Sequence, residues 1–197
     1  MLRKARYYSS AVVLYLLTIA TIGALIIEPR LLNNAAPPSP SNYQTPAISG
    51  KGIISGKPIR IVIPGASIDL SINEGRYYPS SNSWTTSPVN AEFATISMPA
   101  NNHAGTTYIY GHGTDAVFGR IGEHTPPDGT LARIYTDNNH VFTYRLKSVR
   151  NIKPEDTSIL DGLDKGSPQL LVQTCTGTFS EWRTIFDFTF ENVDKVT

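Results

Sequence analysis

Residues 58–72 have the sequence PIRIVIPGASIDLSI, and this stretch indicates what kind of fold the chain adopts. Isoleucine stands at every second position in residues 59–63, and apolar residues alternate with polar ones again in residues 68–72. An alternation with a period of two places the apolar side chains on one face of a β-strand. Two such segments, separated by a Pro-Gly pair, predict two half-buried strands close together in the chain.

The strand pattern continues along the rest of the chain. The polar stretch Asp137-Asn138-Asn139, between two further runs, is typical of a hairpin turn. Helical periodicity is limited to residues 115–122 and 155–163, each long enough for about two turns. Many short strands with few helices predict a mainly β domain, either a barrel or a sandwich. We interpret as strands the apolar runs at residues 107–110, 131–135, 141–149, 170–174 and 183–190.

The composition limits the classes of protein to which the chain can belong. Of its 197 residues, 40% are hydrophobic and 17% are charged, which suits one globular domain with a core. The formal net charge is only +1, and the excess of positive charge lies in the first 30 residues. The remainder has no basic surface of the kind that nucleic-acid binding needs, so no nucleic acid is expected among the partners.

The N-terminus has the pattern of a membrane anchor. Arg3, Lys4 and Arg6 are followed by residues 7–27, a stretch of 21 residues without a charged side chain. As a helix this stretch would be about 31 Å long, which matches the ~30 Å hydrocarbon core of a bilayer. By the positive-inside rule, residues 1–6 are expected in the cytoplasm and everything after the helix outside the cell. The sequence therefore predicts a single-pass protein of the plasma membrane with an extracellular domain.

A cleaved signal peptide is the alternative interpretation of the N-terminus. Its apolar region would be about 7–15 residues long and would end at a cleavage site made of small residues. Here the apolar stretch is longer and is followed by Glu28-Pro29-Arg30, which favours an uncleaved transmembrane helix. Residues 28–56 are rich in Pro, Ser, Asn and Gly and are expected to form a flexible linker. The folded domain then covers residues 57–197.

Cys175 is the only cysteine of the chain, so an exported domain has no partner for an intramolecular disulfide. One interpretation is a buried thiol that packs as a small apolar side chain, which is common for a free cysteine. The other is a nucleophile, because Cys175 follows the apolar run 170–172 and precedes the turn-like residues 176–178. Reactive groups are often displayed at such strand ends. A nucleophilic thiol also needs a base or a cation close to it.

Four histidines are candidates for that base. His112 directly follows a predicted strand and stands between two glycines, so we expect its imidazole to be exposed and available. The other three, His103, His124 and His140, lie in polar loops and are interpreted as solvated side chains. No metal and no cofactor are expected, because the chain has no His-x-x-His, Cys-x-x-Cys or His-Glu-x-x-His spacing.

With these residues in this order, the chain resembles the sortases, the cysteine transpeptidases of bacterial cell surfaces. Residues 109–112, Ile-Tyr-Gly-His, are similar to the strand-Gly-His motif of that family, and residues 171–175, Leu-Val-Gln-Thr-Cys, are similar to its Leu-x-Thr-Cys motif. Arg183, eight residues after the cysteine and at the start of a predicted strand, resembles the arginine of the family. The resemblance covers about residues 57–190 and includes the N-terminal anchor, and it leaves the sortase class unassigned.

The resemblance implies a closed β-barrel of about eight strands with short helices, and a groove where three catalytic residues converge. Cys175 would attack a carbonyl in a C-terminal sorting signal of the LPXTG kind, forming a thioacyl enzyme that an amine then resolves. His112 would act as general acid and base, and Arg183 would stabilise the oxyanion or hold the substrate. The implied partners are secreted proteins that carry a sorting signal, and an amine acceptor from a cell-wall precursor or a pilin lysine.

Two alternatives from other functional classes are open. The first is a noncatalytic, anchored binding domain with a sortase-like fold, which is disfavoured because all three functional positions are filled. The second is a cell-wall cysteine enzyme of the L,D-transpeptidase type. That family places Ser-His-Gly beside its cysteine, whereas Gln173 and Thr174 precede Cys175 here. Asp115, three residues after His112, is interpreted as a helix N-cap or, alternatively, as the group that orders the imidazole.

Overall fold

The computed structural model of the protein describes residues 52–78 and 83–196. The expected cytoplasmic tail 1–6, the membrane helix 7–27 and most of the linker lie outside the described residues, so these assignments stay predictions. Within the two described ranges, no helix is both long enough and apolar enough to cross a membrane.

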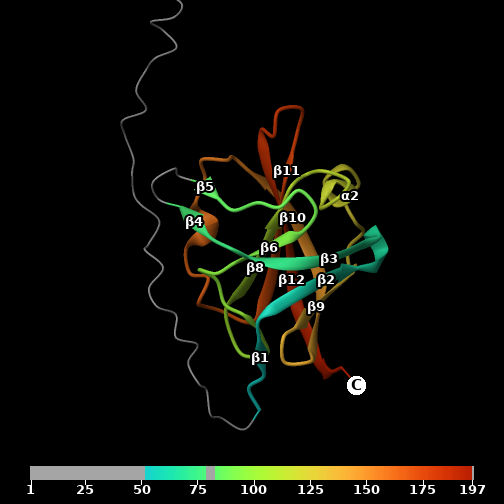
Figure 1. The fold of residues 1–197 in the computed structure, drawn as a ribbon, viewed down its shortest axis with the longest axis vertical. Helices are drawn as coiled ribbons and strands as arrows, with labels where there is room; N and C mark the ends of the chain where they lie inside the picture. Colours follow the sequence, from blue (N-terminus) through green and yellow to red (C-terminus); the bar gives the residue numbers. More distant parts are fainter. Residues whose placement is uncertain (1–51, 79–82, 197) are drawn as a thin grey trace, which may run out of the picture. The chain divides into compact units, whose positions relative to one another are not determined.

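A closed barrel of eight strands forms the body of the domain (Figure 1). These strands are β2 (Pro58–Ile63), β3 (Ile68–Gly75), β6 (Ala91–Ala94), β8 (Thr106–Gly111), β9 (Leu131–Thr136), β10 (His140–Ile152), β11 (Gln169–Thr176) and β12 (Trp182–Lys195). Around the wall they follow the order β10-β12-β11-β8-β6-β3-β2-β9. Most neighbours are antiparallel, but β3 with β6 and β8 with β11 are parallel. The prediction of a mainly β domain is confirmed, and the form adopted is the barrel.

Short elements complete the domain. Two small sheets pair β1 (Ser55–Gly56) with β7 (Ala100–Asn101) and β4 (Tyr77–Tyr78) with β5 (Ser83–Trp84). The helical elements are α2 (Gly119–Glu123) and the 3-10 turns η1 (Pro64–Ala66) and η2 (Ser158–Leu160). Through the β1–β7 pair, the chain is already attached to the domain just before β2 begins.

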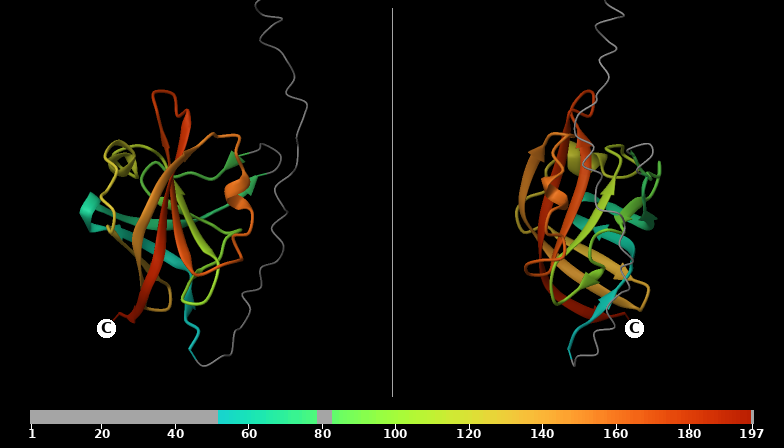
Figure 2. Two further views of the ribbon diagram at one scale, coloured as in Figure 1. Left: turned by 180° about the vertical axis from the view of Figure 1, so that it is seen from behind. Right: turned by 90° about the vertical axis from the view of Figure 1, so that its left-hand side faces the viewer.

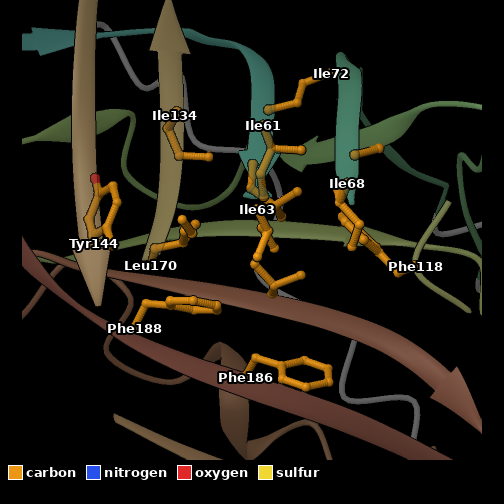
Figure 3. Close-up of a cluster of buried hydrophobic side chains, with 14 of the residues drawn as sticks. Ile61, Ile63, Ile68, Ile72, Phe118, Ile134, Tyr144, Leu170, Phe186 and Phe188 are labelled. Atoms are coloured by element: carbon orange, nitrogen blue, oxygen red, sulfur yellow. The ribbon is translucent and has the colours of Figure 1, made fainter. Parts of the chain in front are cut away.

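Apolar side chains from all around the wall fill the interior of the barrel (Figure 3). The alternation expected for β2 holds for Ile61 and Ile63, which are fully buried. It fails at Ile59, which is 44% exposed, because the register of β2 against β9 shifts between Pro58 and Arg60. On β12, Phe186 and Phe188 share the interior face in the same way. Burying one such side chain stabilises a fold by about 1.5–3 kcal/mol, so the interior determines which residues of each strand point outward.

A second, smaller group of buried side chains lies on the outside of the wall. Leu170 and Val172 belong to the interior core, whereas Leu171, which points the other way, belongs to this second group. We call it the outer cluster; its buried members are Ala94, Tyr108, Tyr110, Leu171 and Ile185. Side chains from β5 and η2 pack against the cluster. Both faces of β8 and β11 are therefore covered along most of their length.

The two helices expected from the sequence are shorter than predicted. Residues 155–163 contain only the three-residue turn η2, and residues 115–122 contain only the first part of α2. The physical reason is clear in the second case, because the backbone N–H groups that a longer helix would use bond elsewhere. The N–H of Phe118 donates to the carbonyl of His112, and the N–H of Gly119 donates to Thr114.

Asp115 is consequently not a helix N-cap. Phe118 occupies that position for α2, and no side-chain cap is present there. Asp115 is exposed in the turn between His112 and the helix. The interpretation of this carboxylate as a cap is therefore wrong.

Candidate active site

The parallel pairing of β8 with β11 brings His112 and Cys175 to the same edge of the barrel. In the register of this pair Gly111 is opposite Thr174, and the Thr174 hydroxyl donates to the Gly111 carbonyl at 3.2 Å. The next residue after Thr174 on β11 is Cys175, and the residue that directly follows the end of β8 is His112. Because parallel strands end at the same edge, the two residues predicted to be base and nucleophile are neighbours.

Arg183 flanks Cys175 from the other side. Strands β11 and β12 are antiparallel, and in their register Cys175 is directly opposite Arg183. Directly opposed residues of an antiparallel pair extend their side chains from the same face. His112, Cys175 and Arg183 thus occupy adjacent positions on three neighbouring strands, and all three are half-buried. The structure brings together the complete set of predicted site residues.

The three side chains belong to the outer face of the barrel. Thr174 is fully buried on the interior side, so Cys175 points outward together with Gln173 and Leu171. His112 directly follows β8, and the alternation of that strand, continued by one residue, puts it on the face that carries Tyr108 and Tyr110 of the outer cluster. The site therefore lies beside the outer cluster, at the end of the wall where the β11–β12 turn projects (Figure 2).

Hydrogen bonds hold the guanidinium of Arg183 at the base of that turn. Its Nη1 donates to the carbonyl of Ser180 at 3.0 Å and to that of Trp182 at 3.4 Å. Ser180 has a positive φ of 58°, which turns the chain back towards β12. A guanidinium carries five N–H donors, on Nε, Nη1 and Nη2. The two hydrogen bonds of Nη1 therefore leave the donors of Nε and Nη2 for a substrate oxygen.

The glycine before His112 serves packing rather than exposure. A side chain at Gly111 would overlap Val117 and press on Phe118, both of which are buried beside the site. His112 itself is half-buried, so our expectation of a fully exposed imidazole between bare glycines is only partly met. The small residue lets the chain fold closely around the end of β8.

A hydrogen-bonded pair next to the nucleophile was not identified from the sequence. The Tyr108 hydroxyl donates to Oε1 of Gln173 at 2.5 Å, across the β8–β11 pair. Burial, and then the neighbouring Tyr110, raise the pKa of Tyr108, while Arg183 acts in the opposite direction. The same hydroxyl is within electrostatic range of Cys175. Counting back two and four residues from the predicted nucleophile and base would have placed both residues on this face.

The remaining histidines lie outside the site. His140 pairs with Lys195, at the opposite end of the β10–β12 ribbon from Arg183, and its ring contacts Asn138. His103 is exposed in the loop that leads to the start of β8. His124 follows α2 and lines a surface pocket of about 370 Å³ together with Gly65, Ser67, Arg120 and Pro126, among others.

Metal ligands do not gather anywhere in the described ranges. Among residues 52–78 and 83–196, no group of three or more His, Cys, Asp or Glu side chains is arranged to hold a metal ion.

Comparison with known proteins points to one family. A family model for the sortase domain matches residues 61–187, which include all three site residues. No curated protein is matched by the chain. Solved structures of similar fold include sortase A from Listeria monocytogenes, with 18% identity and a TM-score of 0.53 over 71% of this chain and 91% of that one.

Two further structures extend the likeness. Sortase A from Actinomyces oris is similar over 72% of this chain and 84% of its own, with 17% identity and a TM-score of 0.57. Sortase C from Clostridium perfringens, solved with the C-terminal cell wall sorting motif, has 15% identity and a TM-score of 0.52; 72% of this chain and 74% of that chain are covered. At these identities the likeness shows a shared fold.

Proposed function

The chain belongs to the sortase family, whose members are transpeptidases, and we propose that it cleaves a C-terminal sorting signal and joins the new carboxyl end to an amine. The observation that carries the proposal is the strand register, which puts Cys175 beside the end of β8, where His112 follows, and opposite Arg183 on β12. A lone thiol flanked by an imidazole and a guanidinium has the neighbours that nucleophilic catalysis needs.

The first half of the proposed reaction is an acyl transfer to the thiol. The S–H proton of Cys175 passes to His112, and the sulfur attacks the carbonyl of the scissile peptide bond in an LPXTG-like signal, so that a C–S bond forms. The C–N bond then breaks, and His112 gives a proton to the departing amine. The product is a thioacyl enzyme that carries the N-terminal part of the substrate protein.

The second half releases the substrate protein to its acceptor. An amine, from a cell-wall precursor or a pilin lysine, attacks the thioester carbonyl while His112 takes its proton. A new C–N bond forms and the C–S bond breaks, which restores the sulfur of Cys175. Over the whole reaction one amide bond is broken and another is formed, so no oxidant or reductant is needed.

Arg183 is proposed to stabilise the negative charge that develops on the carbonyl oxygen in both halves. Its charge is permanent, and its donors extend from the same face as the nucleophile. The hydrogen bonds of Nη1 to the β11–β12 turn hold the guanidinium in place before the substrate arrives. A donor that is already oriented needs little reorganisation during the reaction.

We also propose the cellular setting in which this chemistry takes place. Residues 7–27 anchor the chain in the plasma membrane, residues 1–6 stay in the cytoplasm, and the domain faces outward. Secreted proteins with a sorting signal then meet the enzyme as they leave the membrane, and anchoring raises their effective concentration at the site.

The proposal is tested by trapping the acyl enzyme. The full chain, solubilised in detergent, is mixed with a library of peptides that carry sorting signals, and the intact protein mass is measured. We expect a mass increase equal to the N-terminal part of one peptide class, lost again when an amine is added. If no peptide adds to the wild-type chain while Cys175 is intact, the noncatalytic alternative replaces this proposal.

A further inference from the structure

Glu92 is a buried carboxylate for which the reaction described above gives no role. In residues 52–78 and 83–196 it is the only acidic residue that is buried, with 3% of its surface exposed. Its neighbours along β6, Ala91, Phe93 and Ala94, are all apolar and buried. A carboxylate is seldom placed in such surroundings unless it has a partner, because burial disfavours the charged form.

The strand register shows where this carboxylate lies. Ala91 and Phe93 belong to the interior core, so Glu92, between them, extends from the outer face of the barrel. In the β6–β8 pair Glu92 is directly opposite Tyr110. His112 comes two residues after Tyr110, directly beyond the end of β8, and interacts electrostatically with Glu92. If the register is continued by one residue past Gly111, His112 is the diagonal neighbour of Glu92. Such neighbours are about 7–8 Å apart, within reach of long side chains.

The electrostatic surroundings of Glu92 include the imidazole of the site. Burial raises the pKa of Glu92, whereas Asn73, the charge of His112 and the backbone N–H of Ser87 lower it. The hydrogen bond from Asn73 Nδ2 is long, at 3.4 Å. Asn73 and Ser87 compensate the burial of the carboxylate only in part, and a positive imidazolium is a further stabilising partner.

Other charged or titratable groups lie near His112 in the strand register or along the chain. From β11 there is the thiol of Cys175, from β12 the guanidinium of Arg183, and from the turn after His112 the exposed carboxylate of Asp115. Asp115 is in solvent, where its field is weakened, and Arg183 disfavours a second positive charge nearby. Glu92 is the buried group of opposite sign, so its effect on the imidazolium is the least screened.

We propose that Glu92 is a positioning residue, which stabilises the protonated imidazole of His112 and keeps it directed along the outer face towards Cys175. The inference rests on the proposed function, since His112 must carry a proton before it gives one to the departing amine, and again after it takes one from the acceptor. It explains why a carboxylate stands at a buried position, where desolvation disfavours its charged form. Glu92 acts through His112 and needs no contact with the substrate.

The test replaces the charge and keeps the shape. In Glu92→Gln the side-chain oxygen can still accept from Asn73 and from the Ser87 N–H, but the negative charge is gone. The matched control is Glu74→Gln on β3, which removes an exposed carboxylate paired with Lys57. Both variants are made in the full chain, in detergent, with isotopically labelled histidine, and the His112 signal is assigned with His112→Ala.

We expect three results from Glu92→Gln. The titration midpoint of the His112 ring signal moves to lower pH, because the imidazolium loses its carboxylate neighbour. The kcat for the sorting peptide falls about tenfold with KM unchanged, since proton transfer and not binding is affected. The melting temperature stays the same or rises at neutral pH. Glu74→Gln changes none of these.

The stability result separates positioning from a structural role. Burial raises the folded-state pKa of Glu92 above its unfolded value, so the charged form opposes folding at neutral pH and removing it does no harm. A residue that only supports the barrel would lower the melting temperature when replaced. Overturning results are an unchanged His112 midpoint, an unchanged kcat, or a fall in activity that only follows a fall in stability.

Two further measurements keep the inference testable in every case. If Glu92→Gln does not fold, the wild-type His112 signal should show a second inflection in the acid range where Glu92 titrates, and its absence overturns the proposal. If the wild-type chain transfers no peptide, the proposed function fails. The His112 titration in Glu92→Gln then decides the role of Glu92 separately, because it needs no substrate.

Discussion

The backbone of Gly113 lies directly against the carbonyl of Cys175, so closely that even a methyl group at Gly113 would overlap the carbonyl oxygen. Gly113 follows the predicted base, and Cys175 is the predicted nucleophile. The chain segment after His112 is therefore packed on the backbone of the cysteine itself. A side chain at Gly113 would therefore push the segment that carries His112 away from the strand that carries Cys175.

Replacing Gly113 with alanine should damage both stability and activity. We expect a loss of about 1–3 kcal/mol in the free energy of unfolding, because the methyl group overpacks a rigid contact. Turnover should fall by about 10²-fold, since a displacement of the order of 1 Å at a reacting centre has that effect. Gly65→Ala is the control, because its nearest contact would be 3.5 Å away, at Thr130. Equal activity in Gly113→Ala and Gly65→Ala would show that the close contact of Gly113 with Cys175 does not matter for the position of His112.

Replacing Cys175 with alanine should abolish peptide transfer and leave the fold intact. The covalent route needs the sulfur, so no acyl enzyme can form without it. The side chain is only half-buried, and the change in unfolding free energy should stay near 1 kcal/mol or below. Intact-protein mass and circular dichroism of the full-length variant check both points. Retained cleavage, or a failure to fold, would show that Cys175 is a packing residue.

Alanine at His112 or at Arg183 should each lower turnover by about 10²-fold or more. The first change removes the group that moves the proton, and the second removes donors to the oxyanion. Alanine at His103, His124 or His140 serves as the comparison and should leave turnover within about twofold of the wild type. The turnover of all five alanine variants is measured by steady-state kinetics with the peptide that forms the acyl enzyme. A comparable loss at one of the three comparison sites would identify a different base.

The predicted topology can be checked on whole cells. Protease added outside should remove the domain, and the protein extracted from the membrane should begin at its original N-terminus. The expectation follows from the basic start, the uncharged stretch 7–27 and the unfavourable cleavage context Glu28-Pro29-Arg30. A protected domain would contradict the outward orientation. A mature chain that begins near Ala36 would keep that orientation but remove the anchor.

The barrel strands were predictable because their period-two pattern is local. The alternation in residues 59–63 survives in the structure as buried Ile61 and Ile63, and the strand before Gly111 ends where the glycine stands. The three site residues were found because each stands at a strand end within a recognisable motif. The closure of the barrel depends on which strands pair, and the sequence supported it only through the family resemblance.

The groups around the site could not be predicted in the same way. Tyr108 and Gln173 meet across β8 and β11, strands that lie 65 residues apart at this contact, and their pairing depends on a parallel register that no local pattern reveals. Glu92 is hidden for the same reason, since its neighbour His112 is on another strand. The expected helix over residues 115–122 was shortened because backbone donors bond around His112 instead.

The position of β11 between β8 and β12 has a consequence for the order of folding. The strand that carries the thiol needs one partner that comes 63 residues earlier, where Thr174 bonds to Gly111, and another that is the last strand of the barrel. Contacts between residues so distant in the chain form slowly, because the intervening segments must first be brought into order. A chain that lacks β12 has its cysteine but neither the arginine nor the wall that holds it. We therefore expect the thiol to acquire its special reactivity only in the final cooperative step of folding, so that an unfinished chain cannot capture a peptide.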